Sequence, residues 1–128
     1  MINHNNFLKY LIDYFPEFLN SLEYKKIFPD GGVDEIYLVS ATFFNWYVSK
    51  NKFLFFYNKK INKLFTFSNY IYKNSDDSAV EIIKETFLKN LINKPILRKI
   101  AFNTLDNLPK KDLKKIVTDY RKSIFSFK

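Results

Sequence analysis

Apolar residues recur at intervals of three and four along most of this 128-residue chain, which is the period of a helix with one buried face. Near the N-terminus, Pro16 interrupts the pattern and suits the first turn of a new helix. Before this proline, the residues that follow helical spacing are Phe7, Tyr10, Leu11, Tyr14 and Phe15. After it, the residues predicted to share one face are Phe18, Leu19 and Leu22.

The middle of the chain keeps the helical period and is rich in aromatic residues. A turn is predicted at residues 28–32, which contain a proline, an aspartate and two glycines in succession. Helical faces are then predicted for Ile36, Val39, Phe43 and Tyr47, and for Leu54, Tyr57, Ile61, Leu64, Phe65 and Tyr72. A pair of strands through residues 53–57 is the main alternative, because aromatic residues favour sheets.

Three more helices are expected in the second half of the chain. Ser78 and Glu81 have the spacing of a capping box at a helix start. Pro95 is expected to open the next helix, and Asp106 or Asn107 to cap the last one. The predicted apolar stripes are Val80, Ile83, Phe87, Leu88 and Leu91 in the first of these helices and Leu113, Ile116, Val117, Tyr120 and Ile124 in the last.

These patterns predict an all-α fold. We expect a single helical domain over residues 1–128, built from six or seven helices as a compact bundle or a short solenoid-like stack. Hydrophobic residues make up 47% of the chain, which is enough for a buried core at this length.

Composition excludes most classes of enzyme. The chain has no cysteine, which rules out disulfides, thiol nucleophiles and cysteine-ligated metals. His4 is its one histidine, so neither a histidine metal cluster nor a Ser-His-Asp triad is available. Its two glycines are adjacent and make no glycine-rich phosphate loop. We therefore expect a binding or structural protein that is not an enzyme and needs no cofactor.

The chain is basic, and its charge is unevenly distributed. Lysine and arginine number 21 against 13 acidic residues, which gives a net charge of +8. Residues 36–75 hold six lysines and no acid, and residues 94–128 hold ten basic residues against three acidic ones. This asymmetry indicates an acidic partner surface, a nucleic acid or an anionic membrane. The alternative is the composition bias of an AT-rich genome, which requires no partner.

Membrane insertion is not expected. No apolar run approaches the ~18 residues of a spanning helix, and the N-terminal residues lack the basic start and cleavage site of a signal peptide. The protein is therefore predicted to be cytoplasmic.

Two other patterns have a functional and an ordinary interpretation. Asp76, Asp77, Glu81 and Glu85 offer carboxylates for a hard cation, but helix capping explains the same residues. Residues 95–123 have the outline of a helix–turn–helix with basic flanks. Its lysines attract phosphate but specify little sequence, so non-specific binding is the form of DNA binding that the charge favours.

Aromatic residues beside lysines mark the candidate binding surface. Such mixtures suit stacking on nucleic-acid bases and also protein interfaces, where Trp and Tyr act as anchors. For each aromatic residue, burial in the core is the competing interpretation. The candidate partner-binding residues are Trp46, Tyr47, Lys50, Lys52, Lys59, Lys60 and Lys63 in the middle of the chain and Lys110, Lys111, Lys114 and Lys115 in the last helix.

A family resemblance covers residues 7–122. Its elements are LIDYFPEF at residues 11–18, FFN at 43–45, INKLFTF at 61–67, and Asp76-Asp77 before EIIKETFLKNL at 81–91. With these elements the chain resembles a family of small all-helical bacterial proteins that are often encoded beside polymorphic toxins and are thought to be immunity proteins. Ser68 and Lys89 stand where members often carry acidic residues, which implies a different partner.

The resemblance implies an immunity protein that binds the toxic domain of a cognate effector and occludes it stoichiometrically, without chemistry of its own. The net charge of +8 favours a toxin domain with an acidic face. The alternative function is that of a small basic nucleic-acid-binding or regulatory protein.

Overall fold

The computed structural model describes residues 1–26, 33–52 and 58–125, and these residues form helices and no strand, as predicted. The predicted turn at residues 28–32 and the alternative strand pair at residues 53–57 lie outside them. The α-helices are α1 (Phe7–Tyr14), α2 (Leu22–Lys26), α3 (Val33–Asn51), α4 (Asn58–Asn74), α5 (Asp77–Ile83), α6 (Pro95–Thr104) and α7 (Asn107–Phe125). Shorter turns are the 3₁₀ segments η1 (Pro16–Asn20) and η4 (Lys89–Leu91) and the π-helical segment η3 (Lys84–Leu88).

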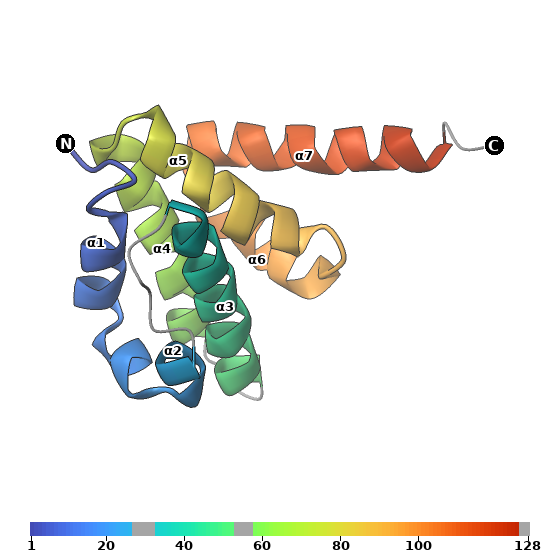
Figure 1. The fold of residues 1–128 in the computed structure, drawn as a ribbon. Coiled ribbons are helices and arrows are strands. Elements are labelled where there is room, and N and C mark those ends of the chain that lie inside the picture. Colours follow the sequence, from blue (N-terminus) through green and yellow to red (C-terminus); the bar gives the residue numbers. More distant parts are fainter. Residues whose placement is uncertain (27–32, 53–57, 126–128) are drawn as a thin grey trace.

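The helices are arranged around α3 and α4, and α7 crosses one end of them (Figure 1). α7 packs against α4 and η3 near its beginning, and its C-terminal half extends beyond the other helices. The N-terminus is tied to the loop between α4 and α5, since the Ile2 N–H donates to the Asn74 carbonyl at 3.0 Å and the Ile2 carbonyl accepts from the Asp76 N–H at 2.8 Å.

Aromatic side chains make up much of the core. Phe15 packs on two aromatic residues of α3, with ring centroids 4.8 Å from Phe43 and 5.0 Å from Tyr47. Phe87 from η3 packs on Phe43 at 6.0 Å, which joins the second half of the chain to the first. The fully buried phenylalanines are Phe7, Phe15, Phe18, Phe43, Phe44, Phe65, Phe67 and Phe87.

The predicted face of Phe18, Leu19 and Leu22 is wrong. Phe18 is fully buried, but Leu19 and Leu22 are exposed. Ser21 separates η1 from α2: its hydroxyl donates to the Phe18 carbonyl at 2.7 Å and accepts from the Tyr24 N–H at 3.0 Å. Because η1 ends before Ser21 and α2 begins after it, the helical spacing does not continue across this residue.

The predicted capping box at the start of α5 is also wrong. Asp76 is the N-cap, and its carboxylate accepts from the N–H groups of Ser78 at 3.0 Å and Ala79 at 3.2 Å. The Ser78 hydroxyl donates to the same carboxylate and accepts from the His4 N–H. Aspartate is as good an N-cap as serine, and here it precedes the serine in the chain.

The stripe predicted for residues 80–91 is confirmed in its main members. Ile83, Phe87, Leu88 and Leu91 are fully buried, and Val80 is half-buried. The backbone changes from an α-helix to the π-helical turn η3 and then to η4 within this stripe.

The last two helices begin where the sequence places them. α6 starts at Pro95, and the Asp106 carbonyl accepts from the Lys110 N–H at 3.0 Å at the start of α7. The predicted buried face of α7 is correct only in its first half. Leu113 and Val117 are buried, whereas Tyr120 and Ile124 are 45% and 49% exposed because α7 extends beyond the core that lies beneath its first half.

Candidate functional site

The four candidate lysines of the last helix lie on the part of α7 that crosses the body. Lys111, Lys114 and Lys115 are exposed, and Lys110 is half-buried. Their helix is held by Leu113, which is fully buried, and by Val117 one turn later. Among the described residues, the three exposed lysines form no ion pair. Their charges are therefore directed to solvent.

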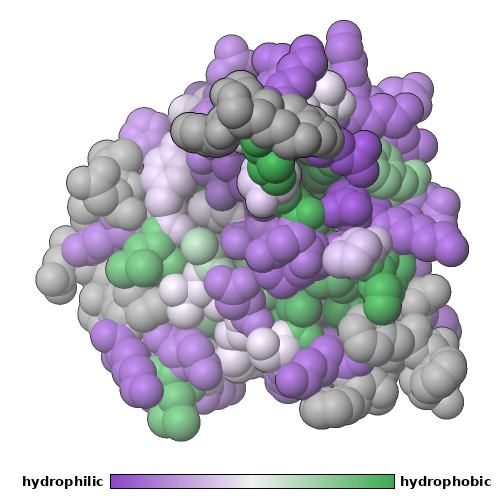
Figure 2. Space-filling view, turned by 90° about the vertical axis from the view of Figure 1, so that its right-hand side faces the viewer, coloured by the Kyte–Doolittle hydropathy of each residue, from purple (hydrophilic) through white to green (hydrophobic). Residues whose placement is uncertain are grey.

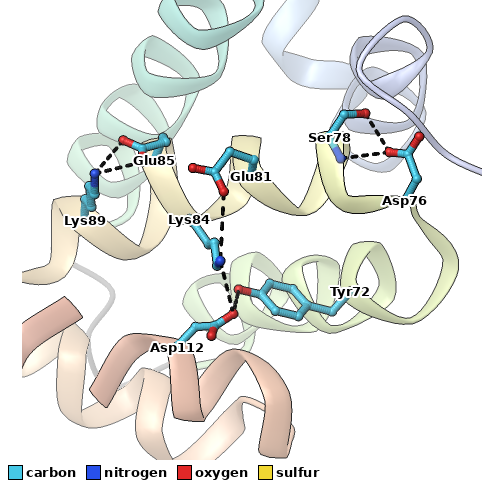
Figure 3. Close-up of polar contacts among 8 residues, drawn as sticks. All are labelled: Tyr72, Asp76, Ser78, Glu81, Lys84, Glu85, Lys89 and Asp112. Carbon is cyan, nitrogen blue, oxygen red and sulfur yellow. Dashed lines mark hydrogen bonds and ion pairs between the residues drawn. The ribbon is translucent and has the colours of Figure 1, made fainter. Parts of the chain in front are cut away.

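A polar contact fixes this part of α7 to the body (Figure 3). The Tyr72 hydroxyl of α4 donates to the Asp112 carboxylate at 2.8 Å, and the Lys84 ammonium of η3 lies 3.9 Å from the same carboxylate. Lys84 also lies 3.9 Å from a Glu81 carboxylate oxygen. Burial, together with the bond to Asp112, raises the pKa of the Tyr72 phenol well above its ordinary value.

The sequence does not predict this polar contact. Asp112 is a single acid among lysines, and its partners Tyr72 and Lys84 lie on other helices. A possible signal is that Asp112 follows the apolar position Pro109 by three residues and precedes Leu113, which places it at the edge of the buried face.

A shallow groove of about 160 Å³ runs beside this contact, between α7 and the α5–η3 segment. On the body side, Lys89 pairs with both carboxylate oxygens of Glu85 at 2.8 and 2.7 Å. On the α7 side, the groove is lined by Lys115, Ile116 and Asp119.

The lysines at the start of α4 form a second group. Lys59 and Lys60 are exposed. Lys63 is half-buried, and its ammonium lies 4.9 Å from the centroid of the Phe15 ring and 5.4 Å from that of Tyr14. These are cation–π distances, so Lys63 covers the edge of the aromatic core.

The remaining candidates lie on the C-terminal half of α3. Trp46 is half-buried and packs on Phe18 with ring centroids 5.3 Å apart. The Lys50 ammonium lies 4.9 Å from the Trp46 ring, and both side chains line an open groove of about 570 Å³ with Glu23 of α2. Lys52, at the end of this segment, is exposed.

Tyr47 does not lie on the surface that the sequence analysis assigned to it. It is 2% exposed, and its hydroxyl donates to the Lys60 carbonyl at 2.8 Å. Burial, with a smaller contribution from the Glu17 carboxylate, raises the pKa of Tyr47 to about 12. Because Tyr47 is a core residue that joins α3 to α4, Trp46 is the one of these two described aromatic candidates that is left as a surface anchor.

The structure does not bring the candidate lysines together. Lys60 lies near one end of α4, and Tyr72, which contacts α7, lies near the other, about 18 Å away at 1.5 Å per residue. The groups on α3 and α4 therefore lie at the end of the molecule opposite α7 (Figure 1). A compact partner can therefore contact the lysines at one of the two ends but not those at both.

The acidic residues around α5 serve the helix. Asp76 is occupied as the N-cap, and the Ser78 hydroxyl and the N–H groups of Ala79 and Ser78 lower its pKa. Within residues 1–26, 33–52 and 58–125, no three His, Cys, Asp or Glu side chains gather as metal ligands would. In the same part of the chain, no helix combines the length and apolar character that a membrane span needs.

Comparison with protein-family models, with curated proteins and with solved structures found no match to this chain. The resemblance to immunity-type proteins therefore stays a prediction from the sequence.

Proposed function

We propose that this protein is an immunity protein that binds an acidic toxin domain through the basic surface of α7 and occludes it stoichiometrically. The observation that carries the proposal is the position of that surface. Lys111, Lys114 and Lys115 point to solvent on a helix whose C-terminal half extends beyond the body.

Charge gives this surface a preference for acidic partners. From Asn107 to Phe125, α7 carries six basic residues and two acidic ones. One of the two acids, Asp112, is already bound by Tyr72 and lies near Lys84. Exposed charges of one sign steer an oppositely charged partner and raise the association rate.

Exposed apolar side chains on the same helix favour a protein as the partner. Tyr120 and Ile124 are about half exposed one and two turns beyond the buried Val117. Aromatic and aliphatic residues rimmed by charge are typical of protein interfaces.

Co-expression with the C-terminal domain encoded by the gene immediately upstream tests the proposal, which requires that domain to be toxic. We expect a 1:1 complex that survives gel filtration at physiological salt and that protects cells from the domain. A folded protein that neither binds the domain nor protects cells would overturn the proposal.

Non-specific nucleic-acid binding is the second candidate, and one observation favours it. Lys111, Lys115 and Lys122 are exposed and share the outer face of α7 at helical spacing, as a contact with a phosphate backbone requires. Titration with an arbitrary DNA duplex at several salt concentrations tests it. Affinity that is measurable at physiological salt and falls steeply with added salt supports this candidate, and its absence eliminates it.

A further inference from the structure

The projecting half of α7, residues 118–124, has an apolar side that the body does not cover. Every described side chain in this range is exposed. Tyr120 and Ile124 follow Leu113 and Val117 at spacings of three, four and seven, so all four share one face of the helix. The first two turns of that face are buried in the body, and the next two are open.

The position of this apolar side restricts what can bind to it. Leu113 and Val117 pack against the body, and Tyr120 and Ile124 carry the same face onto the half of α7 that extends beyond the other helices. We call this exposed apolar face, formed by Tyr120 and Ile124, the α7 notch. Figure 2 looks at this end of the molecule and shows hydrophobic atoms at the level of α7 among hydrophilic side chains. A single partner helix needs only about 10 Å of its length to cover both side chains.

The charges that border the apolar stripe select the sign of the occupant. At about 100° per residue, Lys114 and Arg121 lie roughly 80° from the centre of the stripe. Asp112 and Asp119 lie on the other side at roughly 120°, further from an occupant. Among the charges of α7 itself, those nearest to the apolar stripe are therefore positive.

The same charges disfavour a second copy of this chain as the occupant. In an antiparallel two-fold pair, each flank of the helix faces its own copy, so Lys114 and Arg121 would meet the same two residues. A parallel pair is blocked because the body already covers Leu113 and Val117. A net charge of +8 adds repulsion between copies.

We propose that the α7 notch binds one amphipathic helix of an acidic protein partner. The apolar side of that helix packs on Tyr120 and Ile124, and its carboxylates face Lys114 and Arg121. The inference rests on the proposed function in taking α7 as the partner-binding element, but it is tested without the toxin domain.

The test uses two helical peptides of three heptads each, with Leu at the a and d positions, Ala at the others, and either Glu or Lys at e and g. Each is titrated into the isotope-labelled full chain, and amide chemical shifts are followed by NMR. We expect the Glu peptide to shift amides of residues 113–124 and to bind at least about tenfold more tightly than the Lys peptide.

Two variants locate the site. Tyr120→Asp with Ile124→Asp should abolish binding of the Glu peptide, and the cooperative unfolding of the body should be retained because both side chains lie outside the core. Leu108→Asp alters another exposed apolar residue, at the other end of the same helix, and should leave binding intact.

The proposal is overturned by equal binding of both peptides, by shifts outside α7, or by no shift at roughly 1 mM peptide. It is also overturned if the protein dimerises or binds anionic vesicles and the double variant abolishes that behaviour. Either result would assign the notch to another occupant. If the peptides fail to bind but the toxin complex forms, the helix-binding proposal is wrong and the proposed function stands. If the Glu peptide binds but no toxin complex forms, the proposed function is wrong and the helix-binding proposal stands.

Discussion

Two tyrosines connect α4 to its neighbours by hydrogen bonds of their hydroxyl groups. Tyr72 donates to the Asp112 carboxylate of α7, and Tyr47 of α3 donates to the Lys60 carbonyl of α4. A buried hydroxyl that loses its acceptor costs free energy, so each bond favours one arrangement of the helices.

Removing the Tyr72–Asp112 bond should loosen the attachment of α7. We expect Asp112→Ala to lower the free energy of unfolding by about 1–2 kcal/mol, since a hydrogen bond to a charged group is lost and Lys84 loses a nearby carboxylate. Asp119→Ala, on the same helix and exposed, is the matched control and should change stability by less than about 0.5 kcal/mol. Urea denaturation measures both values. Equal effects of the two substitutions would contradict a specific role of Asp112.

Stability at high pH should depend on Tyr47. Its pKa of about 12 in the folded protein lies above the ordinary value of 10.0, so between these pH values the folded state keeps a proton that the unfolded state loses. The contribution of Tyr47 is therefore fully present below pH 10 and is lost as the pH rises toward 12.

Denaturation of the wild type and of Tyr47→Phe across this range measures the contribution. We expect the difference in unfolding free energy between them to be constant below pH 10 and to shrink above it. A difference that stays constant up to pH 12 would show that Tyr47 titrates normally.

At the scale of the elements, the start of α5 depends on one carboxylate. Asp76 accepts from two backbone N–H groups and from the Ser78 hydroxyl. We expect Asp76→Ala to lower Tm by roughly 3–6 °C, as the loss of an N-cap does. Asp77→Ala, which removes the neighbouring exposed charge in the first turn, should have a much smaller effect. If Asp77→Ala lowers Tm as much as Asp76→Ala does, general charge at the helix start and not the cap explains the stability.

α7 should consist of two halves with different protection. Residues 109–117 contain the buried side chains, whereas all described side chains of residues 118–124 are exposed. Two turns of helix without packing are marginal in water. Hydrogen exchange should therefore be fast at residues 118–124 and slow at residues 113–117, and binding of the Glu peptide should slow the former. Uniform protection along α7 in the unbound protein would contradict this division.

The helical class and most helix starts could be predicted from the sequence because they depend on local spacing and on prolines. Pro16 and Pro95 begin η1 and α6 as expected. The exposure of Tyr120 and Ile124 could not be predicted, because periodicity identifies the apolar face of a helix but not the point where the core beneath it ends. Asp76 and Ser78 are both suitable N-cap residues for the start of α5, and the sequence does not show which of them occupies that position.

The candidate site was predictable only residue by residue. The sequence distinguishes lysines on the polar side of a helix from apolar residues, and Lys59, Lys60, Lys111, Lys114 and Lys115 are exposed as expected. It does not show that the first two lie at the opposite end of the molecule from the other three, since that depends on the packing of α4 against α7. The residues that flank Tyr47 in the sequence are those expected around a surface anchor, yet Tyr47 is buried.

For the whole molecule, the separation of the two lysine groups provides an internal control for charge. Reversing Lys114 and Lys115 or reversing Lys59 and Lys60 changes the net charge by the same amount. The two double variants therefore differ in where the charge is changed and not in how much. Long-range steering responds to both, whereas direct contact responds to one.

The most direct test of the account is the affinity of the upstream-encoded domain for these two variants at physiological salt. Lys114→Glu with Lys115→Glu should weaken binding at least about tenfold, and Lys59→Glu with Lys60→Glu should change it by less than about threefold. Equal weakening by both would mean that overall charge, not the α7 surface, attracts the partner. Loss of binding only in the α4 variant would place the interface at the opposite end and contradict the account.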